Sequence, residues 1–318
     1  MSRAHIPPIS TSGGGTLVVI TEWCPREAFG RLQGVPFHYD PDLWRRPEDL
    51  ERALRDAHGL VVRNQTRVTR ALVAGAGSLR VVGRLGSGLD NIEVEALRER
   101  DLPVVWTPGA NAEAVAEYTI AALLLLTRPL DRWAAATRAG SWDRRPGLDL
   151  AGKTLCIIGY GHVGRRVAQK ARALALQVRA YDRNATPGLH DGHRFFESAL
   201  QAAFGADFLT VHVPATPDTD HLVNAHLLSM LNPGAGFINT SRGSVVDETA
   251  LCQALDQNLA GAVLDVRQVE PPAPDDPLLM HPRVRHTPHV AGLTRESSIQ
   301  IAVRVLSGVA AVLAGKRA

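Results

Sequence analysis

The sequence predicts an α/β protein of two parallel α/β domains, one of them inserted into the other. Three observations predict this. Short β-branched runs alternate with helical stretches, a glycine-rich turn follows one of those runs only at residue 159, and the end of the chain has a long amphipathic pattern. The 318 residues, 45% hydrophobic and 21% charged, suffice for two cores.

The first part of the chain contains four strand-like runs. They are Leu17–Ile20, Gly59–Val62, Leu79–Val82 and Pro103–Val105. A helix is predicted over Arg46–Ala57, with a proline near its start, where proline is tolerated. Asn111 can cap a longer helix that runs to Leu126, because acidic residues follow in its first turns. A further helix is predicted over Leu130–Arg138.

The second part of the chain contains five more predicted strands. They are Thr154–Ile158, Val178–Tyr181, Phe208–Val213, Ala235–Asn239 and Gly261–Asp265. From Glu296 to Leu313, apolar residues recur at steps of three and four, which predicts a helix. We expect this helix to pack on the first part, so that residues 1–103 plus 288–318 form one domain and 104–287 the inserted one.

A dinucleotide-binding fingerprint lies in the inserted part. Gly159, Gly161 and Gly164 form a GxGxxG turn, with His162 and Val163 between the last two glycines, after a predicted strand and before a helical stretch. The glycines would permit a tight turn, close approach of a pyrophosphate and close helix packing, while the helix N-terminus offers N–H donors to phosphate. The pattern predicts a Rossmann-like domain; an ordinary glycine-rich loop is the alternative.

Asp182 lies eighteen residues after the last glycine, at the end of the next predicted strand. A carboxylate there can accept hydrogen bonds from both hydroxyls of an adenosine ribose and would repel a 2′-phosphate, so NAD is expected rather than NADP. The neighbouring Arg183 weakens that preference, because a guanidinium can pair with phosphate.

Charge and cysteine content restrict the possible partners and compartment. The net charge is only +3, and basic residues are interspersed with acidic ones, so no nucleic-acid partner is expected. The three cysteines are far apart in sequence and suggest neither disulfides nor a zinc site, which favours a reducing cytoplasm.

The longest apolar run, Ile120–Leu126, is too short to span a membrane, and residues 1–15 are expected to form a loose tail.

Three residues that could carry acid–base chemistry follow predicted strands: Arg242, Glu270 and His289. The carboxyl ends of parallel strands meet at one edge of a sheet, which is where such folds bind ligands. An imidazole can donate and recover a proton near neutral pH, and a carboxylate beside it fixes its tautomer. Arg242 offers a planar fork that matches a carboxylate. Read singly, each could be structural; the ordered set favours catalysis.

From about residue 16 to 315 the chain resembles the D-isomer-specific 2-hydroxyacid dehydrogenases, and the segment from Val82 to Ile92, VGRLGSGLDNI, resembles their phosphoglycerate dehydrogenase branch. The resemblance implies a discontinuous, flavodoxin-like substrate domain, an NAD-binding Rossmann domain and substrate in the cleft between them. It makes His289 the acid/base, Glu270 its partner and Arg242 the group that holds the substrate carboxylate.

Further site residues follow from the same resemblance. Those expected to bind the cofactor beyond the fingerprint are His212, Val213, Pro214, Thr240, Ser241, Asp265 and Gly292; those expected to bind substrate are Arg63, Asn64, Gln65, Ser87 and Gly88, with Arg242 and His289. Arg267 stands where the family commonly has an aromatic residue, and could face the cleft or the solvent. His286 and His289 are close in sequence, but Pro288 lies between them and no cysteine accompanies them, so no metal is expected.

The resemblance implies an NAD-dependent oxidoreductase that interconverts a 2-hydroxy acid and its 2-oxo acid. If the arginines at positions 63, 84 and 242 face the cleft, they favour a dianionic substrate such as 3-phosphoglycerate or sulfolactate; if Arg63 and Arg84 face solvent or a domain interface, hydroxypyruvate or glyoxylate is the alternative. Alternatives are a phosphite dehydrogenase and a non-enzymatic NAD(H) sensor related to co-repressors. A homodimer through the region 111–138 is also expected.

Overall fold

The computed structural model describes residues 16–32 and 34–316, which divide into two compact units. Unit 1 comprises Met1–Asn111 with Thr294–Ala318, and unit 2 comprises Ala112–Leu293. The tail expected over residues 1–15 lies outside the described residues. The unit boundaries fall at 111 and 293 rather than at the expected 103 and 287. The segment 288–293, which carries His289, belongs to unit 2 because backbone N–H groups in it donate to Asp265 of that unit.

Unit 1 contains a five-stranded parallel sheet in the order β2-β1-β3-β4-β5. Its strands are β1 (Val18–Ile20), β2 (Phe37–Tyr39), β3 (Gly59–Val62), β4 (Val81–Arg84) and β5 (Val104–Val105). Its helices are α1 (Pro47–Leu54), α2 (Arg70–Gly75), α3 (Val94–Arg98) and α11 (Arg295–Leu313), with short 3-10 turns η1 (Arg26–Leu32) and η2 (Leu43–Arg45).

Alternate strand residues of unit 1 supply two cores. Val18 and Ile20 face η1 and α11, whereas Val19 faces the side covered by α1, α2 and α3. Among the described residues α11 has the length and apolar composition of a membrane span. Its Val305, Leu306 and neighbouring apolar residues are buried in the first of these cores, which accounts for its composition.

Unit 2 contains an eight-stranded sheet in the order β13-β12-β11-β10-β6-β7-β9-β8, parallel except where β8 meets β9. Its strands are β6 (Thr154–Ile158), β7 (Gln177–Tyr181), β8 (Gly188–His190), β9 (His193–Phe195), β10 (Phe208–Val211), β11 (Gly236–Asn239), β12 (Gly261–Leu264) and β13 (Val284–His286). Its helices are α4 (Ala112–Thr127), α5 (Leu130–Arg138), α6 (His162–Ala173), α7 (Ala199–Ala203), α8 (Ala225–Ser229), α9 (Glu248–Gln257) and α10 (Pro277–Met280), with 3-10 turns η3 (Pro217–Thr219) and η4 (Gly243–Val245).

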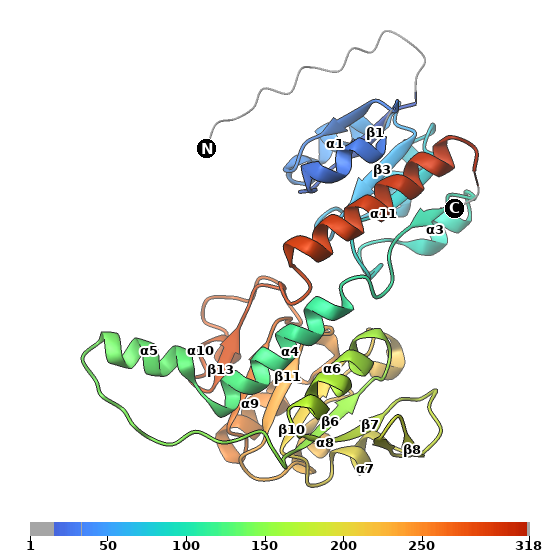
Figure 1. Cartoon of the computed structure of the whole chain (residues 1–318). Helices are drawn as coiled ribbons and strands as arrows, with labels where there is room; N and C mark the ends of the chain where they lie inside the picture. The colour runs from blue at the N-terminus through green and yellow to red at the C-terminus, as the bar shows by residue number, and fades with distance from the viewer. Residues whose placement is uncertain (1–15, 33, 317–318) are drawn as a thin grey trace. The chain divides into compact units, whose positions relative to one another are not determined.

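Helices cover both faces of this second sheet. Buried residues of α4 and α6 pack with Leu155 and Ile157 of β6 on one face, and α4 runs beside α6 (Figure 1). Residues of α7, α8 and α9 pack with Cys156 and Ile158 on the other face. Burial of the sheet on both sides explains why its central strands are continuously apolar in sequence.

The expected α/β class with parallel sheets is confirmed, while four short strands were not expected. The edge strand β2, the hairpin β8–β9 and the edge strand β13 each have three-residue strands that include polar side chains. Such segments carry little periodicity, and their pairing is decided by the neighbouring strand.

Candidate active site

The glycine turn between β6 and α6 is closely packed on one side and open on the other. Gly159 has φ +93°, and a Cβ there would lie 2.5 Å from the carbonyl oxygen of His212. A Cβ on Gly164 would lie 2.1 Å from the Gly159 oxygen. At Gly161, by contrast, a Cβ would have no protein atom within 4 Å. The turn therefore needs glycine for packing at two positions and presents bare backbone at the third, which fits the approach of a pyrophosphate.

Asp182 lies at the end of β7 beside this turn. Its Oδ2 accepts a hydrogen bond from the Tyr160 N–H at 2.7 Å, and its Oδ1 accepts one from the Asn184 N–H at 2.9 Å. Each carboxylate oxygen can accept more than one bond, so the side chain can still receive ribose hydroxyls. Arg183 pairs with the exposed Asp218 at 3.4 Å, and this second acid counteracts its attraction for a 2′-phosphate.

The segment after β10 passes under the same turn. The ring of His212 lies between two threonine hydroxyls, with Nε2 3.1 Å from Thr210 Oγ1 and Nδ1 3.4 Å from Thr240 Oγ1. Burial lowers the pKa of His212 to about 3, so this ring stays neutral. Val213 and Pro214 follow it at the partly exposed and exposed end of the strand.

The turn that carries Arg242 is organised by the buried Asn239. The Asn239 side chain accepts hydrogen bonds from the N–H and the hydroxyl of Ser241, both at 2.9 Å, and its Nδ2 donates to the Arg242 oxygen at 2.9 Å. The Ser241 hydroxyl is thereby engaged within the protein. The Arg242 guanidinium donates to the Ser241 carbonyl at 2.7 Å and is partly exposed.

Glu270 and His289 form a direct pair within unit 2. Nδ1 of His289 lies 2.9 Å from Oε2 of Glu270, and each side chain is 39% exposed. The other carboxylate oxygen accepts the Arg267 N–H at 3.1 Å. Burial raises the pKa of Glu270, but His289, the Arg267 N–H and the charge of Arg242 outweigh it and hold this pKa below its usual range. The three expected catalytic residues therefore interact electrostatically around one carboxylate.

Asp265 anchors the segment that carries His289. Its carboxylate accepts the N–H groups of Val290 and Ala291, each at 2.8 Å, and the Thr287 hydroxyl at 2.5 Å. The His289 N–H donates to the Asp265 carbonyl at 2.9 Å, and His289 has φ +56°. Asp265 thus fixes the backbone on which the imidazole stands, while its Oδ2 retains capacity for the expected nicotinamide amide. Gly292 directly follows the anchored Ala291.

Arg267, near the pair, occupies neither of the two positions considered for it from the sequence. Arg267 faces neither cleft nor solvent: its side chain is 6% exposed and is paired with Glu248 and Asp276. His286 has a different environment from His289, since its Nε2 lies 3.0 Å from the Leu278 oxygen.

In unit 1, a buried carboxylate holds the loop 63–66. Glu22, which is 3% exposed, accepts four backbone N–H groups at 2.8 to 3.1 Å. The donors are Arg63, Asn64, Gln65 and Thr66. These backbone donors are therefore engaged by the protein itself, and only the side chains of the loop remain to contact a substrate.

The Arg63 guanidinium lies over the ring of Trp23 at 5.3 Å. The side chains of Asn64 and Gln65 are on exposed residues. In the glycine loop after β4, the Gly86 N–H donates to the Arg84 carbonyl, and Ser87 Oγ donates to Asn111 Oδ1 at 2.7 Å. Gly88 follows as a partly exposed residue. The Gly86 N–H is thus engaged within this loop.

Sequence reasoning missed several residues that position the site: Glu22, Asn239, Glu248 and Asp276. Glu22 and Asn239 could have been found, because each is a polar residue at the carboxyl end of an apolar strand, a position where buried polar groups need partners. Glu248 and Asp276 could not, since their role depends on the pairing with Arg267.

Comparison with known proteins shows which protein family the chain belongs to. Residues 120–291 match the family described as D-isomer specific 2-hydroxyacid dehydrogenase, NAD binding domain. The fold and the glycine turn of unit 2 are those of an NAD-binding domain. The chain belongs to the D-isomer-specific 2-hydroxyacid dehydrogenase family, so the resemblance stated from the sequence is confirmed.

Individual relatives extend the similarity beyond this domain. An (S)-sulfolactate dehydrogenase of Chromohalobacter salexigens is 40% identical over 80% of this chain and 85% of its own length. A chloroplastic D-3-phosphoglycerate dehydrogenase 2 of Arabidopsis thaliana is 39% identical over 85% of this chain but 44% of its own length, so the chain spans about half of such relatives. The crystal structure of the TT0316 protein of Thermus thermophilus is 33% identical over 95% of this chain and 98% of that chain, with a TM-score of 0.89.

We predict that Gly161→Ala weakens NADH binding at least about tenfold, or ~1.4 kcal/mol, without lowering thermal stability. The added methyl group meets no protein atom and would occupy space that a pyrophosphate approaches. Fluorescence titration with NADH and thermal unfolding measure the two effects. Gly164→Ala is the contrasting variant, since its methyl group collides with the Gly159 carbonyl and should lower stability as well. Unchanged NADH affinity in Gly161→Ala would contradict this placement.

Proposed function

We propose that this protein is an NAD-dependent oxidoreductase that interconverts a small 2-hydroxy acid and its 2-oxo acid. The observation that carries the proposal is the 2.9 Å contact between His289 Nδ1 and Glu270 Oε2, in the unit that also has the NAD-binding turn. Membership of the dehydrogenase family supports it.

The proposed chemistry divides hydride and proton transfer. NAD supplies or accepts the hydride when it is bound. His289 gives a proton to the substrate oxygen during reduction and takes it back during oxidation. Because Glu270 holds Nδ1, the transfer atom is Nε2. The ionised Glu270 stabilises the imidazolium form, and the net lowering of its pKa keeps it ionised at neutral pH.

Arg242 is proposed to bind the substrate carboxylate. Its guanidinium is partly exposed, and its charge acts on Glu270, so it lies in the same electrostatic environment as the acid–base pair. A bidentate contact would orient the substrate and polarise the adjacent carbonyl group.

For the substrate we propose a small acid with a second anionic group, of the phosphoglycerate or sulfolactate type. Relatives with both names are among the most similar proteins. We propose that Arg63 binds this second group, since its guanidinium is positioned over Trp23 beside a loop fixed by Glu22. Hydroxypyruvate and glyoxylate are the simpler substrates against which this proposal is tested.

We expect His289→Ala to lower the rate of NADH-dependent reduction by about 10²- to 10⁴-fold while NADH binding is retained, because the ring supplies the proton and lies outside the glycine turn. Absorbance of NADH is followed with a panel of 2-oxo acids, with and without a phosphate or sulfonate group, and with NADPH in place of NADH. The parental rate in His289→Ala would refute the mechanism. Tight NADH binding with no turnover by the parental protein on any acid would instead support an NAD-sensing role.

We expect Glu270→Gln to move the acid limb of the pH profile for oxidation to lower pH, because the Glu270 carboxylate lies 2.9 Å from His289 Nδ1 and favours the protonated ring. The neutral imidazole is the active form in oxidation, and loss of the carboxylate destabilises the competing imidazolium. The measurement is kcat/KM against pH for the parent and the variant. A profile that keeps its position would exclude Glu270 as the partner of His289.

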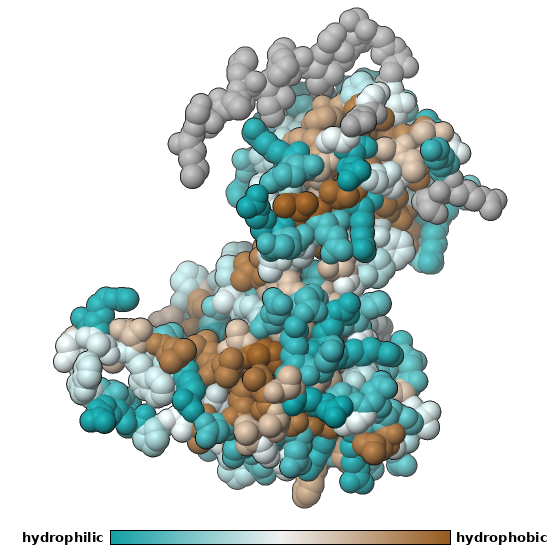
Figure 2. All heavy atoms as spheres, viewed as in Figure 1, coloured by the Kyte–Doolittle hydropathy of each residue, from teal (hydrophilic) through white to brown (hydrophobic). Residues whose placement is uncertain are grey.

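We also propose a homodimer formed through the region 111–138 and the segment that follows it. The helix α5 has no buried residue, and the segment after it runs outside the body of unit 2 (Figure 1). Apolar side chains gather over α4 in Figure 2. Several large apolar residues of this region are exposed: Leu124, Leu130, Trp142 and Leu148, with Trp142 at 80%. Exposed large apolar residues in one region support an interface there.

For the dimer, Trp142→Glu combined with Leu148→Glu is expected to halve the mass measured by light scattering, because two charges would enter an apolar contact. Leu189→Glu is the matched control: this residue is 76% exposed on β8, outside the proposed contact. A parental protein of monomer mass, or a dimer that persists in the double variant, would contradict the proposal.

We further propose that the protein works in the cytoplasm. Its three cysteines are free thiols, and Cys24 and Cys156 are buried, with burial raising the pKa of each to about 12. Such thiols are poorly reactive, as suits buried apolar positions in a reducing compartment.

A further inference from the structure

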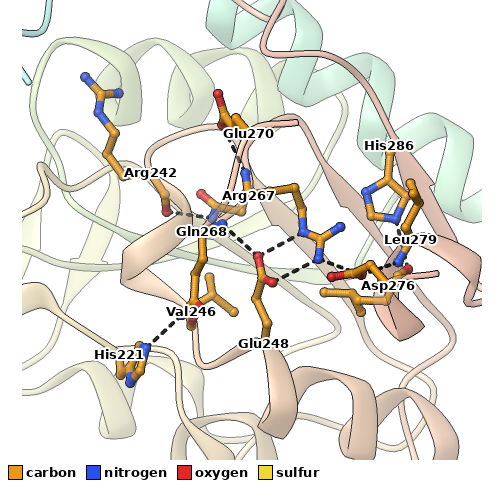
Figure 3. Close-up of polar contacts among 12 residues, drawn as sticks. His221, Arg242, Val246, Glu248, Arg267, Gln268, Glu270, Asp276, Leu279 and His286 are labelled. Atoms are coloured by element: carbon orange, nitrogen blue, oxygen red, sulfur yellow. Dashed lines mark hydrogen bonds and ion pairs between the residues drawn. The ribbon is translucent and has the colours of Figure 1, made fainter. Parts of the chain in front are cut away.

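Arg267 is a buried guanidinium held between two carboxylates. Its Nε lies 2.8 Å from Glu248 Oε1, and one terminal nitrogen lies 2.9 Å from both Glu248 Oε2 and Asp276 Oδ1. Figure 3 shows the Arg267 side chain extending toward these two acids, whereas the Arg242 side chain points away from them. The arginine is therefore not available to substrate.

The two carboxylates belong to the starts of two helices. Glu248 is the first residue of α9, and its Oε1 also accepts the Gln268 N–H at 2.9 Å. Asp276 is the N-cap of α10, where its Oδ1 accepts the Leu279 N–H at 2.8 Å. Through its side chain, Arg267 thus joins the beginning of the loop 267–276 to the end of the same loop and to α9.

The backbone of the same residue contacts the active-site groups. The Arg267 N–H donates to Glu270 Oε1, and the other oxygen of Glu270 holds His289. On the opposite side, a Cβ on Gly243 would lie only 1.9 Å from the Arg267 carbonyl carbon. The peptide of Arg267 therefore packs directly against the turn that follows Arg242.

We propose that Arg267, held by Glu248 and Asp276, is a positioning residue that fixes the Glu270 carboxylate and, through it, the His289 ring. This inference rests on the proposed dehydrogenase function. Glu270 is on an exposed loop and could adopt several rotamers, and the Arg267 N–H selects the one that meets His289. The direction of that N–H depends on the backbone of Arg267, which its buried side chain holds at both ends of the loop.

The other charged groups around Arg267 do not replace it as the group that positions Glu270 near neutral pH. Glu248 and Asp276 are the acids that contact the guanidinium, and Arg242 acts on Glu270 from the neighbouring turn. Two further titratable groups lie near it, Cys252 and His286, and burial raises the pKa of the Cys252 thiol, so this thiol adds no charge. Burial lowers the pKa of His286, and its Nε2 meets the Leu278 oxygen, so it adds no positive charge beside Arg267.

The test compares Arg267→Met, Arg267→Lys and Glu248→Gln with the parent in the full-length protein, at a temperature where circular dichroism shows each to be folded. For Arg267→Met we expect kcat to fall between about tenfold and about 10²-fold, with NADH binding retained. The acid limb of the oxidation profile should move to lower pH, as in Glu270→Gln but by less. Arg267→Lys keeps the charge without the planar fork and should recover part of the rate.

Arg283→Met is the matched control. This arginine donates to the Leu255 and Leu259 carbonyls at the other end of α9, so its removal disturbs the same helix without touching the loop of Glu270. Its kinetic constants and pH profile should equal those of the parent. A fall in kcat as large as that of Arg267→Met would show that the effect is general loosening of α9 and would overturn the proposal.

The double variant Arg267→Met with Glu270→Gln separates positioning from a merely structural role. If Arg267 acts through Glu270, the double variant should be no slower than Glu270→Gln alone. Multiplied losses, or an unchanged pH profile in Arg267→Met, would overturn the inference. If Arg267→Met does not fold, Glu248→Gln with and without Glu270→Gln gives the same comparison. Parental rates in both His289→Ala and Glu270→Gln would instead refute the proposed function itself.

Discussion

The parallel direction of the central strands of unit 2 determines where its candidate functional groups lie. Strands β6, β7, β10, β11 and β12 run in the same direction, so the glycine turn, Asp182, His212, Arg242 and Asp265 all follow strand ends at one edge. Parallel strands bring their carboxyl ends together, and loops at that edge are free to differ in sequence while the strands stay apolar. Residues more than a hundred positions apart can then act in one reaction.

Buried or partly buried carboxylates convert these loops into fixed structure. Glu22, Asp182, Asp265 and Glu248 each accept at least one backbone N–H from a loop. A carboxylate that accepts several N–H groups satisfies donors that no strand or helix satisfies, and it ties a loop to an ordered element. The site therefore depends on acids whose first role is structural. Glu270, the acid that meets His289, accepts the N–H of Arg267, the residue just before Gln268, whose N–H is held by Glu248.

The sequence was sufficient for the elements that carry strong periodicity. Helix Leu130–Arg138 and strand Thr154–Ile158 have the expected bounds, because a continuous apolar strand and a clear helical pattern lead to few alternatives. Strand β4 begins two residues later than expected, since Leu79 and Arg80 lie between the turn at residues 77–78 and the first strand residue, Val81. The partners of Arg267 could not be predicted, because residues 248, 267 and 276 come together only when α9, β12 and α10 are in place. Family resemblance predicted Glu270 and His289 as an acid–base pair, but the sequence could not show which atoms of the two side chains meet.

The carboxylate of Glu22 has an evolutionary consequence for the loop 63–66. Because it takes all four backbone N–H groups, the path of the loop does not depend on which side chains stand at positions 63, 64 and 65. Side chains there can change by single substitutions while the main chain stays in place. Substitutions at these positions should therefore change the chemistry that the loop presents with little cost in foldedness, so this loop can diverge between related chains more readily than the buried strands that carry it.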